Sequence, residues 1–250
     1  MQSSSLVLGT DDDRVSESIS HDGRIVAWGL LTAAGAGAVI GAVVGGIGGR
    51  LAMLSLRLTS NEAVLGVTTD DGFEIGKFTT ATFFLLTVTA GLGGATGAAY
   101  FAMRSALPRR GRALLWATVV GLVAGADLLK PNSLDFTLLG PRSFAVATFV
   151  LLPAVAALLI AFALERLLAL EPWSNRPLTV LLTLGALPLI PVLPVFLVLF
   201  GAAVLLRRRP RVQRRILAFA RFAVPLFLVA VTLRSGVQLW HDADRILRAS

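Results

Sequence analysis

The chain contains no cysteine. That absence excludes disulfide bonds, thiolate metal sites and a cysteine nucleophile. Histidine is almost as scarce: only His21 and His241 are present, near opposite ends of the chain. No metalloprotease, serine-hydrolase or nucleotide-binding motif stands in its required strand–turn–helix context. The sequence therefore favours a non-enzymatic protein, with no catalytic residues, no cofactor and no metal.

Charge is also scarce. Only 15% of the 250 residues are Asp, Glu, Lys or Arg, whereas 55% are hydrophobic and the mean hydropathy is +0.77. A soluble domain carries about 25% charged residues, so these values favour several apolar spans over one soluble core. The net charge of +8 does not indicate nucleic-acid binding, because the arginines lie mainly between apolar runs, where the cytoplasmic loops of membrane proteins carry them.

The apolar runs predict an all-α, polytopic membrane bundle with about five full spans and a proline-broken pair of short segments. Residues 1–24 are polar and acidic and are expected to be a disordered cytoplasmic tail. Residues 25–235 form the transmembrane domain, and residues 236–250 form an amphipathic tail along the membrane surface. The five spans are expected at about 25–49, 78–103, 113–129, 144–164 and 216–233.

Residues 178–206 leave two topologies open. They form 29 uncharged residues, about 43 Å as one helix, which exceeds the ~30 Å of a bilayer core. Pro188, Pro191 and Pro194 interrupt the run, so we expect two short segments joined by a turn at 187–194. This places all basic loops, including 104–112, on the cytoplasmic side. The bias toward Ala, Leu, Arg and Gly suggests a bacterial plasma membrane.

Small residues recur four apart in the first three spans. These rows predict helix faces on which a second backbone packs closely, and we expect the three spans to pack on one another. A pore-lining interface and homo-oligomerisation remain alternatives for the same faces. The predicted packing glycines are Gly37, Gly41, Gly45 and Gly49 in the first span, Gly93 and Gly97 in the second, and Gly121 and Gly125 in the third.

Charged residues at the outward ends of the spans form a second candidate site. Arg50 ends the glycine row and Asp127 ends the third span, so we predict that the two side chains pair. The alternative is that each is an interfacial residue that fixes helix depth. The predicted polar vestibule consists of Arg50, Glu74, Lys77, Asp127, Lys130, Asp135 and Arg142.

A cluster of arginines precedes the last span, and we expect it to set topology and to contact anionic lipid headgroups. It comprises Arg207, Arg208, Arg209, Arg211, Arg214 and Arg215. The favoured function is a channel or transporter, and the alternative is an accessory or assembly subunit of a membrane complex. Membrane lipids are the expected partners, with a second copy or another membrane protein as a further possibility. The span centres carry few polar groups besides threonine, which counts against ion-coupled transport.

Overall fold

The computed structural model describes residues 11–60, 80–131, 141–170, 176–187 and 210–248, and contains no strand among them. Turns apart, these residues are helical, and one element is a π-helix (η1). The helices are α1 (Asp11–Ile40), η1 (Gly41–Gly48), α2 (Gly49–Leu58), α3 (Thr80–Met103), α4 (Arg112–Leu128), α6 (Arg142–Leu167), α7 (Arg176–Ala186) and α9 (Pro210–Arg248).

Four helical stretches are long and apolar enough to cross a membrane: Arg24–Leu58, Thr82–Met103, Arg142–Leu167 and Phe222–Arg248. They correspond to four of the five expected spans. The remaining one, α4, has 17 residues and a length of about 26 Å, at the short end of what a span requires. The described chain is thus all-helical, with four helices of membrane-spanning length and hydropathy.

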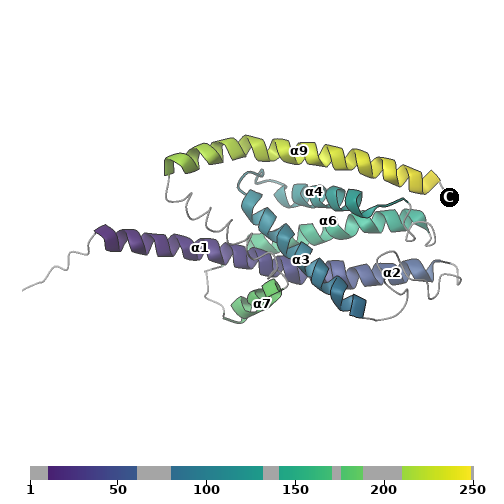
Figure 1. The fold of residues 1–250 in the computed structure, drawn as a ribbon, viewed down its shortest axis with the longest axis horizontal. Helices are drawn as coiled ribbons and strands as arrows, with labels where there is room; N and C mark the ends of the chain where they lie inside the picture. The colour runs from purple at the N-terminus through teal and green to yellow at the C-terminus, as the bar shows by residue number, and fades with distance from the viewer. Residues whose placement is uncertain (1–10, 61–79, 132–140, 171–175, 188–209, 249–250) are drawn as a thin grey trace, which may run out of the picture.

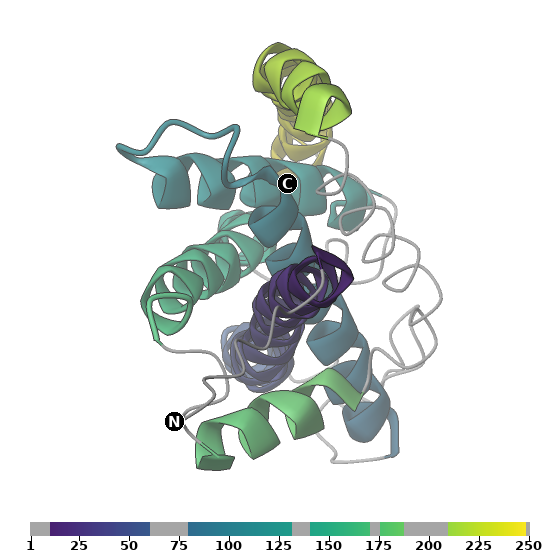
Figure 2. The same cartoon turned by 90° about the vertical axis from the view of Figure 1, so that its left-hand side faces the viewer.

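Helices α1, η1 and α2 form one continuous rod, which α3 crosses at an angle (Figure 1). Helices α4 and α6 pack against each other, and α9 lies on the outer side of α4 (Figure 2). The short helix α7 packs on α1. Buried Ala33, Tyr100, Trp116 and Ile160 bring α1, α3, α4 and α6 into one hydrophobic core.

Both ends of the described chain are helical. Residues 11–24, expected to be disordered, belong to α1. Acidic residues at a helix N-terminus interact favourably with its dipole, and a helix already nucleated in the span extends at little cost. At the other end, residues 236–248 continue α9 without a break, so the amphipathic tail and the last span are one helix.

Helix α7 includes the first residues of the proline-containing run 178–206. It has 11 residues, about 16 Å, which is too short to cross a bilayer. It packs closely on α1, where a Cβ on Gly35 would lie 2.2 Å from the carbonyl oxygen of Leu182. The predicted turn at 187–194 lies, beyond Leu187, outside the described residues, as do Arg207, Arg208 and Arg209. Arg211, Arg214 and Arg215 lie in the first turns of α9.

Candidate functional site

The glycine rows of α1 and α3 bring two backbones into contact. A Cβ built on Gly37 would lie 2.3 Å from the carbonyl oxygen of Gly93, and one on Gly93 would lie 2.2 Å from that of Gly37. A Cβ on Gly97 would likewise meet the carbonyl oxygen of Ala33 at 2.2 Å. No side chain larger than hydrogen fits at these positions without moving a helix.

The glycine row changes its neighbour at the π-helix. A Cβ on Gly41 would still meet the backbone of α3, 2.3 Å from the carbonyl oxygen of Thr89. On Gly45 its nearest neighbour would be the Thr89 side chain, at 3.0 Å, and on Gly49 it would meet only Leu152 of α6, at 3.8 Å. The row therefore closes one interface with its first half and leaves space beside its second half.

The third glycine row packs elsewhere than expected. Gly121 and Gly125 of α4 face Val150 and Ala154 of α6, and α4 packs mainly on α6 and α9. The expectation that the first three spans pack on one another through these rows is therefore wrong for the third row, although Trp116 of α4 packs on Tyr100 of α3. A small-residue row predicts a close partner but does not specify which helix supplies it.

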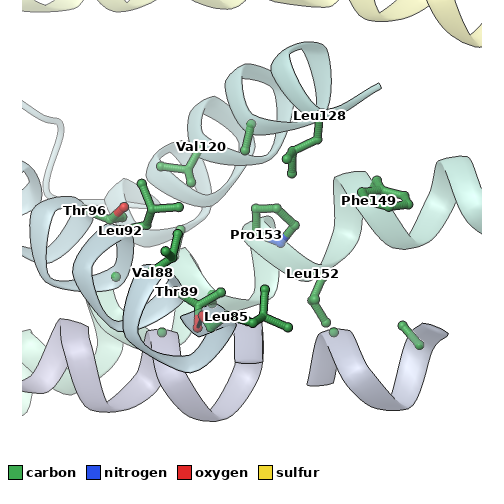
Figure 3. A pocket seen from close by; sticks show the side chains of 18 of the residues that line it. Leu85, Val88, Thr89, Leu92, Thr96, Val120, Leu128, Phe149, Leu152 and Pro153 are labelled. Atoms are coloured by element: carbon green, nitrogen blue, oxygen red, sulfur yellow. Dashed lines mark hydrogen bonds between the residues drawn. The ribbon is translucent and has the colours of Figure 1, made fainter. Parts of the chain in front are cut away.

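A cavity of about 530 Å³ lies between the glycine row, α3, α4 and α6. In Figure 3, α3 contributes Leu85, Val88 and Leu92 on one side and α6 contributes Leu152 and Pro153 on the other. Helix α4 closes a third side with residues that include Val120 and Leu128. Gly41, Gly45 and Gly49 line the fourth side, where the absence of side chains leaves room.

The cavity is partly open to the surface. Helices α3 and α4 diverge from their connection at residues 104–111 (Figure 1), and Tyr100 of α3 packs on Trp116 of α4 near that connection. Several lining residues of α3 and α4 are well exposed: Phe84 by 67%, Leu92 by 64% and Leu128 by 46%. The exposed part of the lining therefore presents apolar side chains, as the flank of a membrane helix does toward lipid.

The cavity has almost no polar chemistry. No ionisable residue lines it among the described residues, and the described chain holds no cluster of three or more metal-ligating side chains. The Thr89 hydroxyl donates to the carbonyl oxygen of Leu85 at 2.8 Å, within α3. The Thr148 hydroxyl donates to the carbonyl oxygen of Phe144 at 2.8 Å, within α6. Such a site is suited to binding apolar groups and offers no acid, base or nucleophile.

The predicted vestibule residues are only partly brought together. Arg50 donates from Nη2 to the hydroxyl of Thr82, at 2.9 Å, which links the rod to the start of α3. Asp127 is exposed on α4, and within the described chain no ion pair joins it to Arg50. The reason is that α4 packs on α6 and α9 rather than on the rod. Glu74, Lys77 and Asp135 lie outside the described residues.

We expect a double-mutant cycle of Arg50→Ala and Asp127→Ala to give a coupling energy within about 0.5 kcal/mol of zero, as for non-contacting sites. The matched cycle of Arg50→Ala and Thr82→Val should give about 1 kcal/mol, because it removes a direct hydrogen bond. Unfolding titrations of the purified protein measure both values. A coupling above 1 kcal/mol for the first pair would contradict the arrangement of α4.

A polar network that the sequence did not reveal lies at the opposite end of the bundle. The hydroxyl of Tyr100, a fully buried residue, donates to Glu165 Oε1 at 2.9 Å. Arg112 forms an ion pair with the other oxygen of Glu165, and Trp116 packs on the Tyr100 ring with centroids 5.9 Å apart. The network joins α3, α4 and α6. The one sequence feature that could have drawn attention to this network is that Tyr100 is the only tyrosine of the chain.

Fold and site together define an all-helical protein with four helices of membrane-spanning character and an apolar cavity among them. The sequence matches no protein-family model, no curated protein and no solved structure. The functional assignment therefore depends on the geometry of this chain.

Proposed function

We propose that the protein is a non-enzymatic membrane protein of transporter type whose substrate is an apolar or amphipathic molecule taken from the bilayer. The observation that carries this proposal is the cavity of about 530 Å³ between the glycine row, α3, α4 and α6. Its volume lies within the range of about 300–1,000 Å³ that is common for ligand sites. Its walls favour hydrocarbon over water.

The composition of the cavity walls also supports an apolar substrate over an ion. Ions cross membranes past carbonyl rings, charged side chains or water-lined constrictions that replace their hydration shells. The described lining offers leucines, valines, alanines and glycines instead, with hydroxyls only on Thr89, Thr96 and Thr148. The exposed apolar lining residues Phe84, Leu92 and Leu128 would let an apolar molecule reach the cavity from the lipid.

Filling the cavity should abolish binding. Ala156 of α6 lines the cavity, whereas Ala147 of the same helix is exposed and does not. In proteoliposomes, a photoactivatable hexadecanol should label the lining of α3, α4 and α6, and excess unlabelled hexadecanol should compete. We expect Ala156→Phe to reduce this saturable labelling at least tenfold, because the phenyl ring occupies the space, and Ala147→Phe to leave it unchanged.

Non-saturable labelling alone would show contact with bulk lipid and would contradict a binding site. Transport is tested with the purified chain in proteoliposomes, where it should speed exchange of a fluorescent single-chain amphiphile between leaflets, and Ala156→Phe should not. The alternative, an accessory subunit with glycine faces for packing, is supported if the chain alone is inactive and a stoichiometric partner copurifies in mild detergent.

A further inference from the structure

The cavity ends against a layer of buried side chains near the 104–111 connection. This closing layer consists of Tyr100 of α3, Trp116 of α4 and Leu164 of α6, whose exposed fractions are 0%, 4% and 0%. Each lies four residues, about one helical turn, past the nearest lining residue of its helix and therefore on the same face. The layer shares one hydrophobic cluster with the lining residues Ala157 and Ile160. The lining therefore stops where this layer begins.

A polar latch joins the same three helices on the side of the layer away from the cavity. The Tyr100 hydroxyl donates to Glu165 Oε1 at 2.9 Å, and Arg112 forms an ion pair with the other oxygen of Glu165. Arg112 lies one turn before Trp116 on α4, and Glu165 directly follows Leu164 on α6. The closing layer is buried, whereas the side chains of Arg112 and Glu165 are each 27% exposed. The latch thus ties α3, α4 and α6 together at the more exposed edge of the layer.

Two features make the closed layer easy to open once the latch is released. Trp116 Nε1 is buried and has no hydrogen-bond partner within the described structure. A buried donor without an acceptor is unfavourable, and water admitted between the helices would supply the acceptor. Helix α4 begins after Gly111, which has a φ of +77° and at which a Cβ would meet nothing within 4 Å. A glycine that is free of packing at a helix end can absorb a change of backbone angles, as hinge residues do.

A transport cavity needs access from two sides in turn. The exposed lining residues Phe84, Leu92 and Leu128 provide one approach, and the closing layer blocks the end near 104–111. Both charges of the latch are partly exposed, so water can replace each partner when the ion pair separates. Opening at this end is therefore less costly than the separation of a fully buried ion pair.

We propose that the closing layer is a gate of the cavity and that the Tyr100–Arg112–Glu165 latch holds this gate shut. The proposal rests on the proposed function and specifies how access to the same site is controlled. In the closed state, the latch holds α4 against α3 and α6. When the Arg112–Glu165 ion pair separates, α4 turns at Gly111, Trp116 moves away from Tyr100, and water reaches the cavity from the 104–111 end.

The absence of cysteine allows the gate to be tested with a single reporter thiol. Thr96→Cys places this thiol on the lining residue of α3 nearest the gate. In proteoliposomes, a cationic methanethiosulfonate reagent added to both sides measures contact of the thiol with water. We expect slow modification in the otherwise native chain and a rate about tenfold higher with Arg112→Ala, because the open state becomes more populated. Tyr100→Phe removes only one hydrogen bond and should raise the rate less.

Two controls separate gating from changes of charge and from general loosening. Arg166 is an exposed arginine beside Glu165 on α6, so Arg166→Ala changes the charge at the same end and should leave the rate unchanged. Ala145→Cys is a second reporter thiol, at a buried position packed with Leu129 and Ile246 in a different cluster. This thiol should stay unreactive in every latch variant.

A charge exchange tests the latch directly. Arg112→Glu and Glu165→Arg should each speed modification of the Thr96→Cys thiol. The two changes together should largely restore the slow rate, because the ion pair re-forms with its charges reversed and the effects are coupled. These variants and Tyr100→Phe decide the question if Arg112→Ala folds poorly.

The outcomes separate the gate from the binding site. Equal rates with and without the latch, while hexadecanol still labels the cavity saturably, would overturn the gate and leave the proposed function in place. A parallel rise of the Ala145→Cys rate in all latch variants would also overturn the gate, because the whole bundle would then have loosened. Absence of saturable hexadecanol labelling in the native chain would overturn the proposed function, and the gate with it.

Discussion

Replacing Gly93 by leucine is expected to destabilise the protein by about 1–3 kcal/mol, toward the upper end of the range for overpacked cores. Even the first carbon of the new side chain would lie 2.2 Å from the carbonyl oxygen of Gly37 and 2.7 Å from the Cα of Gly41. These are backbone atoms, so relief requires α1 and α3 to separate along their crossing. A rotamer change cannot provide it.

Gly91→Leu is the matched control on the same helix. A Cβ built on Gly91 meets nothing within 4 Å, so the substitution should be neutral or should stabilise α3 by up to about 1 kcal/mol through helix propensity. Unfolding in a denaturing detergent, followed by circular dichroism, measures both variants. Equal stability of the two would mean that the α1–α3 backbones are not in contact.

The sequence predicted the helical class well because its strongest signals are local. Long uncharged runs and glycines spaced four apart constrain one helix at a time, and they located the faces around Gly37 and Gly93. The partner of a face is a tertiary property. Gly121 and Gly125 have the same four-residue spacing as the glycines of the first two spans, yet they pack on Val150 and Ala154 of α6.

The cavity could not be predicted for the same reason. It exists because side chains of α3, α4 and α6 surround a stretch of the rod where Gly45 and Gly49 carry none. The sequence of one helix does not show how the other helices are placed around it. The sequence singled out Lys130 and Arg142 by charge and position, and the structure places them just beyond α4 and at the start of α6. The sequence also paired Arg50 with Asp127, since nothing in it showed that α4 lies away from the rod.

The Tyr100–Arg112–Glu165 network could not be predicted because its members are far apart in sequence and Glu165 lies just beyond the fourth span as predicted, 144–164. Its strength is testable. Arg112→Ala should destabilise the protein by about 1–3 kcal/mol, because it leaves a partly buried carboxylate without its counter-charge. The side chains of Arg112 and Glu165 are each 27% exposed, so the effect should fall below that of a fully buried pair.

Arg248→Ala provides the comparison, because it removes an ion pair of the same type on the surface of α9. The side chains of Arg248 and Asp244 are 79% and 39% exposed, and such pairs contribute about 0–1 kcal/mol. Adding Glu165→Gln to Arg112→Ala should recover part of the loss, since glutamine removes the unpaired charge and still accepts the Tyr100 hydroxyl. If Arg112→Ala and Arg248→Ala cost the same and Glu165→Gln restores nothing, the network does not hold α3, α4 and α6 together, and apolar packing of Tyr100 and Trp116 alone joins these helices.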